Sequence, residues 1–300
     1  MGRLVSMRRA LEVPELATRA HDQAAAAAER AEVEVSVLDS IDGFRDASAI
    51  FDSVWGTGPA NAQMPAELIR ALTHAGGYAA GALSDRSMLG AVVGFLGRDE
   101  GGLHLHSHIL GVRTNDRARG VGYALKLHQR AWALERGLQR VAWTFDPLVR
   151  RNAFFNFQKL GASAKTYFVN FYGSMTDGVN VGDESDRLLI EWDLDSTRVS
   201  IAADGGLDEP SVDELIDDGA VALSVTDDGR PRLENASAST LLCATPESIV
   251  ALRRERADVA LEWRRALRET LGGAMRDAYS VRGFTRSGWY VIERDEGPGE

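Results

Sequence analysis

Apolar and polar residues alternate along some stretches of this chain and recur at helical spacing along others. Alternation predicts β-strands, and apolar residues three or four positions apart predict amphipathic helices. Strands are expected at 33–38, 78–83, 87–96, 104–112, 141–145, 166–172 and 187–194, and helices at 41–54, 65–74, 121–136 and 149–160. The order β-α-α-β-β-β-α-β-α-β-β predicts an α/β (α+β) fold in which helices flank a mixed central sheet.

The segments on either side of this central part differ from it. Residues 13–31 are rich in alanine and have high helix propensity, and we assign them no chemistry. After Leu194, strands are expected near 198–201, 221–223 and 240–244, followed by a helical region from 245 to about 275 and a closing hairpin at 279–285 and 288–292. We therefore expect a helical arm at 1–31, a central domain at 32–195 and an α/β extension at 196–300.

The stretch from His104 to Gly122 combines a strand, a glycine-bearing turn and a helix start. The strand ends at Val112, and the turn reads Arg117-Ala118-Arg119-Gly120-Val121-Gly122. A helix start presents N–H groups without partners and the positive end of the helix dipole, so it favours anions. Glycine lets a phosphate approach the backbone closely, and arginine adds full charge. The stretch predicts a phosphate site, although a plain basic turn is the alternative.

Two known phosphate-binding motifs do not match this stretch. The P-loop needs Lys and Ser/Thr after its second glycine, where this chain has Tyr123 and Ala124, and the dinucleotide fingerprint needs a third glycine. The turn resembles the pyrophosphate loop of the GNAT (GCN5-related) N-acyltransferases, whose pattern Arg/Gln-x-x-Gly-x-Gly/Ala is filled by Arg117, Gly120 and Gly122. The predicted element order is also similar to that of the GNAT fold, with the loop after the fourth strand.

This resemblance implies an acyl-CoA site, with acetyl-CoA as the expected cofactor. The backbone amides of Arg117, Ala118, Arg119, Gly120, Val121 and Gly122 would bind the pyrophosphate. The strand end from Leu110 to Val112 would bind the pantetheine arm, and an N–H near Leu110 would polarise the thioester carbonyl. Gly111 marks the position where a bulge or a splay of the strands is expected.

The helix after the fifth strand resembles the second half of the family pattern, in which Asn, Ala and Tyr lead into Lys-Leu-Gly. Ala153 and the run Lys159-Leu160-Gly161 match it. Arg150 stands at the family's asparagine position, so Asn152 and Asn156 are the expected substitutes.

The family's tyrosine position holds Phe157, which cannot protonate a departing thiolate. Tyr172 is therefore the expected general acid, and Tyr167, on the same predicted strand, is the second candidate.

Direct attack on a thioester also needs a base, because an ammonium group cannot act as a nucleophile. His104, His106 and His108 alternate along the central strand and should share one face. His108 is nearest to the implied thioester position, and imidazole titrates in the useful range, so His108 is the expected base or water relay. Structural histidines and a metal site are the alternatives, and no metal is expected because no further ligand cluster accompanies them.

Two further residues are expected to contact the acceptor. Trp55 lies in the predicted loop between the first two helices, and Asp146 ends the fifth strand. A core role for Trp55 and a helix-capping role for Asp146 remain open. Arginines between residues 253 and 268 alternate with acids and predict a solvated helix face.

Composition limits the partners. The net charge of -10 argues against nucleic acid and suits a cationic small molecule. The single cysteine, Cys243, lies in an apolar run and is expected to be a buried strand residue rather than a nucleophile. No stretch has the length of a membrane span, and the N-terminus lacks the apolar core of a signal peptide, so we expect a cytoplasmic protein without a membrane partner.

The expected function is that of an acyl-CoA-dependent N-acyltransferase, most simply an acetyltransferase. It would move an acyl group to an amine of a small molecule by direct attack in a ternary complex. The alternative is a non-catalytic acyl-CoA sensor or regulatory module, which Phe157 favours, and a third option is other chemistry on an acyl-CoA. A homodimer is compatible with all three.

Overall fold

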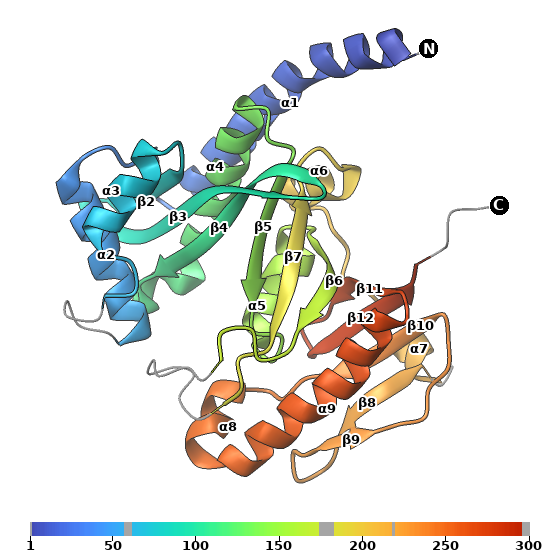
Figure 1. Ribbon diagram of the computed structural model, residues 1–300. Coiled ribbons are helices and arrows are strands. Elements are labelled where there is room, and N and C mark those ends of the chain that lie inside the picture. The colour runs from blue at the N-terminus through green and yellow to red at the C-terminus, as the bar shows by residue number, and fades with distance from the viewer. Residues whose placement is uncertain (1, 57–61, 174–182, 218–219, 296–300) are drawn as a thin grey trace. The chain divides into compact units, whose positions relative to one another are not determined.

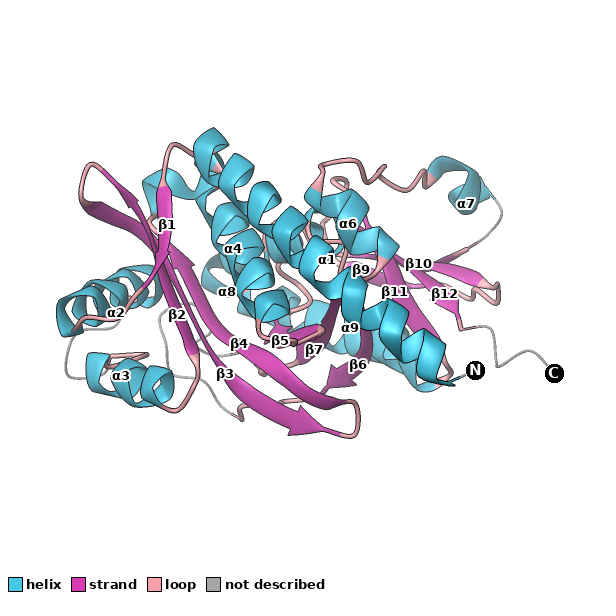
Figure 2. Ribbon diagram, turned by 90° about the horizontal axis from the view of Figure 1, so that it is seen from above, coloured by secondary structure: helices cyan, strands magenta, loops and turns pink. Residues whose placement is uncertain are grey.

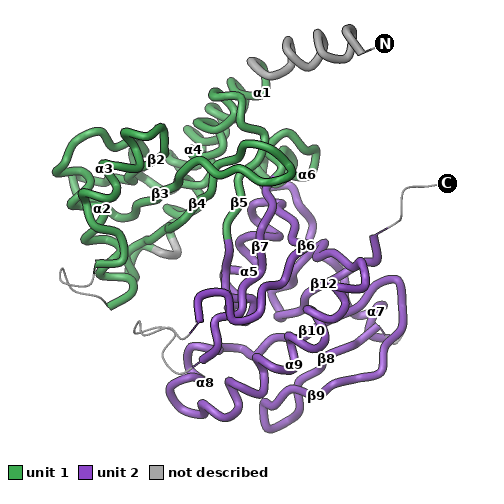
Figure 3. The backbone as a smooth tube through the Cα atoms, viewed as in Figure 1, with its two compact units in different colours: residues 1–143, 193–204 green, residues 144–192, 205–300 purple. Residues whose placement is uncertain are grey.

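The computed structural model describes residues 2–56, 62–173, 183–217 and 220–295, and its side chains from residue 15 except those of residues 117, 118 and 165 (Figure 1). The chain forms two compact units (Figure 3). The first unit comprises Met1–Trp143 and Asp193–Asp204, and the second comprises Thr144–Trp192 and Gly205–Glu300. Each unit is considered by itself below.

The first unit contains a mixed sheet with the strand order β1-β2-β3-β4-β5. Its four leading strands pair with one another in antiparallel fashion, and β4 pairs with β5 in parallel. The bounds are β1 Glu34–Val37, β2 Tyr78–Ser84, β3 Ser87–Asp99, β4 Gly102–Val112 and β5 Arg140–Phe145. Asp85 and Arg86, both with positive φ, make the tight turn between β2 and β3, as the predicted hairpin requires.

Helices cover both faces of this sheet (Figure 2). Helices α2 and α3 pack on one face through a core that includes Phe44, Phe51 and Ile69. Helix α4 lies on the other face, and α1 packs along α4 through buried alanines at helical spacing, including Ala20, Ala24 and Ala27. The bounds are α1 Gly2–Arg30, α2 Ile41–Trp55, α3 Ala66–His74, α4 Val121–Glu135 and α6 Thr197–Ala203. The alanine-rich segment from residue 15 onwards is therefore a packed helix.

The second unit contains strands in the order β7-β6-β11-β12-β10-β8-β9. The bounds are β6 Ser163–Phe168, β7 Arg187–Asp193, β8 Val221–Val225, β9 Pro231–Leu233, β10 Thr240–Ala244, β11 Tyr279–Phe284 and β12 Trp289–Arg294. Its helices are α5 Arg150–Phe154, α7 Asp213–Asp217, α8 Ile249–Glu255 and α9 Ala257–Arg276. Ala164 of β6 pairs with Val281 of β11, so residues 144–192 share one sheet with most of the predicted extension.

A cluster of four buried charges lies in this unit. Arg264 on α9 binds Asp146 at 2.8 Å and Asp183 at 2.8 Å. Arg253 on α8 binds Asp183 at 2.8 Å and also contacts Asp146. All four side chains are at most 7% exposed. Burial alone would raise the pKa of Asp146, but the two guanidinium groups hold that pKa well below the usual carboxyl range.

The predicted order of elements from β1 to β7 is confirmed. The strand expected at 166–172 instead runs from Ser163 to Phe168, because Asn170 and Gly173 adopt left-handed backbone conformations that end it. The segment 198–201 is helical rather than extended, since the side chain of Ser196 accepts a hydrogen bond from Val199 N–H and starts α6.

Other differences lie in the helices. Helix α5 continues into a π-helix from Phe155 to Lys159, which ordinary helical spacing does not predict. The helical region expected from 245 to about 275 consists of two helices, α8 and α9, which are separated at Arg256. The predicted solvated face is wrong at Arg253 and Arg264, whose acidic partners come from distant segments of the chain.

The prediction for Cys243 is confirmed: the residue is fully buried in β10, and burial raises the pKa of its thiol to about 12. Within the described residues, no helix is both long enough and apolar enough to cross a membrane.

The buried cluster predicts a large difference between two neighbouring arginines of α9. Arg264→Met leaves two buried carboxylates with one guanidinium, and we expect a loss of about 3–5 kcal/mol in the free energy of unfolding. Arg265→Met is the matched control, because Arg265 is exposed, and a change within about 0.5 kcal/mol is expected there. Urea denaturation of both variants measures the difference.

The same cluster predicts a pH dependence with a definite sign. The lowered pKa of Asp146 contributes stability above the unfolded pKa of about 4, and this contribution is lost as the pH falls through and below that value. The gap between wild type and Arg264→Met should therefore shrink in acid. Equal stability of the two proteins at neutral pH would contradict the structural role of the cluster.

Candidate functional site

The connection from β4 to α4 is a turn that ends in a helix start, as predicted, and it also contains a 3₁₀ turn. A 3₁₀ turn from Thr114 to Arg119 leads into Gly120, which has a φ of 87° and is the N-cap of α4. The carbonyl of Gly120 accepts hydrogen bonds from the N–H groups of Tyr123 and Ala124, both at 3.0 Å. A residue with a side chain would be strained at this φ, so the turn depends on glycine.

The second glycine of the loop lies beside the end of β4. A Cβ placed on Gly122 would lie 3.6 Å from the side chains of Leu110 and Val112, which is ordinary contact distance. Packing alone therefore does not require glycine at this position. The residues present fit a phosphate group bound through backbone N–H groups.

The structure describes the side chain of one of the two loop arginines, Arg119. The side chain of Arg117 lies outside the described residues, as does that of Ala118. Arg119 donates hydrogen bonds to the backbone carbonyl of Ala31 and to the carboxylates of Glu32 and Asp116. Much of its charge is therefore used to hold the turn against the start of β1.

Strand β4 carries a β-bulge at His108. Val93 of β3 pairs with Ile109, while the next residue, Gly94, pairs with Ser107, so His108 is the extra residue. A bulge or a splay of the strands was expected at Gly111, and the observed bulge lies three residues earlier. Gly111 instead pairs regularly with Ala91, and a Cβ there would lie 3.1 Å from Phe51 of α2. Gly111 is glycine because α2 packs closely on it.

The histidines of β4 have different surroundings. His104 is 7% exposed and lies beside Asp99 and Arg140. His106 and His108 instead contact each other and Phe95. Burial, followed by the neighbouring His108, lowers the pKa of His106 to about 4, and the protein atoms packed around His108 lower its pKa as well. Both imidazoles are therefore uncharged near neutral pH.

Among the described residues, no group of three or more His, Cys, Asp or Glu side chains is arranged to hold a metal ion.

Trp55 is the last residue of α2 rather than a loop residue. Its ring meets Phe51 edge-on at 6.4 Å and packs against the core under α2 and α3. The loop at 57–61, which was expected to overhang the acceptor, lies outside the described residues.

The remaining predicted site residues belong to the second unit. Asn152 is half-buried on α5, and Asn156 is 3% exposed in the π-helix. Asp146 accepts a hydrogen bond from Leu148 N–H at 3.0 Å, and both of its carboxylate oxygens are bound by Arg264. Because this carboxylate is buried and already paired with arginine, it is not available to bind an acceptor, contrary to the prediction for Asp146.

The tyrosine candidates differ in exposure. Tyr172 lies in the turn after β6 and is 49% exposed, and its hydroxyl is 3.2 Å from Thr144 Oγ1. The hydroxyl of Tyr167 donates to Asp186 at 2.8 Å. Burial, followed by the charge of Asp186, raises the pKa of Tyr167 well above its usual value. Of the two, Tyr172 has the accessible hydroxyl.

The two departures from the family pattern have structural explanations. Phe157 is fully buried, with ring centroids 6.1 Å from Phe145 and 6.0 Å from Tyr290. Arg150, at the asparagine position, donates to the hydroxyl and the carbonyl of Thr245. These residues therefore pack α5 against the C-terminal strands of the same unit.

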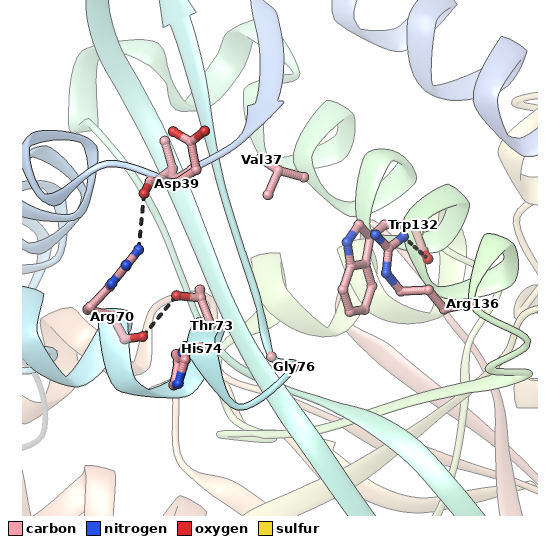
Figure 4. A pocket seen from close by; sticks show the side chains of 10 residues that line it. Val37, Asp39, Arg70, Thr73, His74, Gly76, Trp132 and Arg136 are labelled. Atoms are coloured by element: carbon pink, nitrogen blue, oxygen red, sulfur yellow. Dashed lines mark hydrogen bonds between the residues drawn. The ribbon is translucent and has the colours of Figure 1, made fainter.

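A separate hollow of about 340 Å³ lies in the first unit (Figure 4). The Arg136 guanidinium stacks over the Trp132 ring at 4.2 Å on one side, and Arg70 donates to the Asp39 carbonyl at 3.3 Å on the other. The lining is Val37, Leu38, Asp39, Arg70, Thr73, His74, Gly76, Gly77, Trp132 and Arg136. This hollow was not predicted, because its residues come from several separate elements, and their mixed charges favour no one ligand.

Comparison with solved structures finds acetyltransferases. The ribosomal-protein-S18-alanine N-acetyltransferase of Escherichia coli matches with 14% identity and a TM-score of 0.43, over 55% of this chain and 96% of that one. A GNAT-family acetyltransferase of Streptococcus pneumoniae matches with 14% identity and a TM-score of 0.41, over 53% and 98%. An aminoglycoside acetyltransferase from an uncultured soil metagenomic sample matches with 19% identity and a TM-score of 0.35, over 38% and 78%.

No protein-family model matches the sequence, and no curated protein matches it significantly. The order of the elements from β1 to β7 and the mixed sheet with helices on both faces agree with the fold that the resemblance in the sequence implies.

The contact between Arg150 and the C-terminal hairpin gives a stability prediction. Gly288 has a φ of 96°, and a Cβ there would collide with the Arg150 guanidinium. We expect Gly288→Ala to lose about 2–4 kcal/mol in the free energy of unfolding, from backbone strain and the collision together. Gly229→Ala is the control, since Gly229 has a φ of 81° but its nearest neighbour is 4.0 Å away. Equal losses in thermal unfolding would show that the collision is relieved without cost.

Proposed function

We propose that this protein is an acyl-CoA-dependent N-acyltransferase, most simply an acetyltransferase, acting on an amine of a small molecule. The observation that carries the proposal is the left-handed Gly120 between β4 and α4. This conformation ends the 3₁₀ turn and starts α4, whose N-terminus has the positive dipole end and the N–H groups that favour an anion. The backbone of residues 117–122 would hold the pyrophosphate of coenzyme A.

Further residues are proposed to hold the rest of the cofactor. Leu110 and Val112 would bind the pantetheine arm through their main chain. Acyl-CoA, when bound, supplies the acyl group as an activated thioester. The start of α4 supports this assignment, because the side chains of Leu110 and Val112 lie 3.6 Å from a Cβ placed on Gly122, so the loop and the end of β4 are adjacent.

The base is proposed from its environment. His108 would take the proton from the acceptor ammonium, since its lowered pKa keeps the imidazole in the basic form near neutral pH. Trp55, at the end of α2, is proposed to border the acceptor.

A non-catalytic acyl-CoA sensor is the second candidate. The buried Phe157 favours it, because no hydroxyl is present at the position where the family pattern has tyrosine. The two candidates share the cofactor loop and differ in turnover: a sensor would bind acetyl-CoA without releasing thiol when amines are added.

The cofactor loop can be tested with two glycines at opposite ends of α4. Gly120→Ala strains the loop, and we expect it to weaken acetyl-CoA and coenzyme A binding at least about tenfold in calorimetric titration. Gly137→Ala is the matched control, because Gly137 has a φ of 72° and open space around it. It should cost similar strain and leave binding unchanged. If Gly120→Ala binds acetyl-CoA like the wild type, the loop assignment fails.

The base can be tested by its pH profile. In the wild type, kcat/KM should fall as the pH drops through the lowered pKa of His108, because protonated imidazole accepts no proton. His108→Gln should lose this acid limb and about 10²–10⁴-fold in rate. His21→Gln, on the exposed side of α1, should leave the profile unaltered. Using one acceptor throughout cancels the titration of the amine itself. An acid limb that survives in His108→Gln would assign the base elsewhere.

A further inference from the structure

Three rings gather on one face of the sheet in the first unit. The centroid of Phe95 on β3 is 5.0 Å from that of His106 and 5.6 Å from that of His108, and the two imidazoles are 6.1 Å apart. Phe95 pairs directly with His106 across the two strands, and the bulge brings His108 beside them. We refer to these three residues as the ring cluster.

The ring cluster continues the face that α2 and α3 cover. Val93 and Ile109, the strand neighbours of Phe95 and His108, pack in the core beneath these helices. Phe95 and His106 are half-buried, whereas His108 is exposed. Apolar surface thus extends from the covered core to the proposed base, and part of it remains accessible to a ligand.

The charge of this face restricts what it can bind. With both imidazoles uncharged near neutral pH, the ring cluster offers no cation to pair with a carboxylate. Ring faces attract ammonium groups, and they pack favourably against other aromatic rings in offset or edge-to-face arrangements. An amine attached to an aromatic group satisfies both preferences at once.

We propose that the ring cluster binds the aromatic ring of the acceptor, and that Phe95 determines specificity for arylalkylamines. This inference rests on the proposed function, in which His108 takes the proton of the acceptor. A base must come within hydrogen-bonding distance of that proton, so the acceptor binds beside His108 and within reach of the neighbours of His108. Those neighbours are the rings of Phe95 and His106.

The test compares two amines of similar shape on protein saturated with coenzyme A. Phenethylamine carries an aromatic ring, and cyclohexylethylamine carries a saturated one. We expect calorimetric titration to show tighter binding of phenethylamine to the wild type, and Phe95→Leu to weaken it about fivefold with little change for the saturated amine. Leu96→Ala is the control: Leu96 is 41% exposed and, as the next strand residue, points to the opposite face.

The outcomes separate this inference from the proposed function. If coenzyme A binds but phenethylamine does not, or if Phe95→Leu weakens both amines equally, the aromatic specificity is overturned while the acyltransferase stands. If coenzyme A fails to bind but phenethylamine binds in a manner that depends on Phe95, the ring cluster is upheld and the cofactor assignment fails. Loss of phenethylamine binding in Leu96→Ala as well as in Phe95→Leu would mean that general destabilisation is responsible, which also overturns the proposal.

Discussion

The second unit depends on a buried electrostatic contact between segments that are far apart in the sequence. Asp146 follows β5, Asp183 precedes β7, and their guanidinium partners are on α8 and α9. Burying charges is unfavourable unless each is paired and hydrogen-bonded, so these segments must come together as one. The backbone pairing of β6 with β11 also joins two of these distant segments. Residues 144–192 and 205–300 therefore form one compact unit.

Local sequence patterns predicted most of the fold because strand and helix periodicities depend on neighbouring residues. The hairpin of β2 and β3 and the glycine turn before α4 were predicted for this reason. Features that depend on contacts between distant segments of the chain were not predicted. The charged positions of α8 and α9 look solvated until their acidic partners are known, and nothing in the sequence around His108 indicates an extra residue in the pairing with β3.

The candidate site could be predicted from the sequence to a similar extent. Gly120 has the left-handed backbone conformation of a glycine turn, and Gly122 is in ordinary packing contact with Leu110 and Val112, so the cofactor role of the loop stays a prediction. The roles of single side chains depend on surroundings that spacing does not reveal. Asp146 is occupied by two arginines, Tyr167 is bound to Asp186, and Tyr172 lies in a turn. Burial and hydrogen bonding, rather than position in a motif, decide which of these groups is accessible.

The use of Arg150 and Phe157 has a consequence for how such chains are detected. Both residues serve packing: one reaches the loop after β10, and the other fills the core beside Tyr290. A sequence pattern that requires asparagine and tyrosine at these two positions is mismatched twice by this chain, although Arg117, Gly120 and Gly122 fit the loop pattern. A pattern that combines the loop glycines with Arg150 and its neighbours Thr245 and Gly288 would better recognise relatives that share the same C-terminal strands.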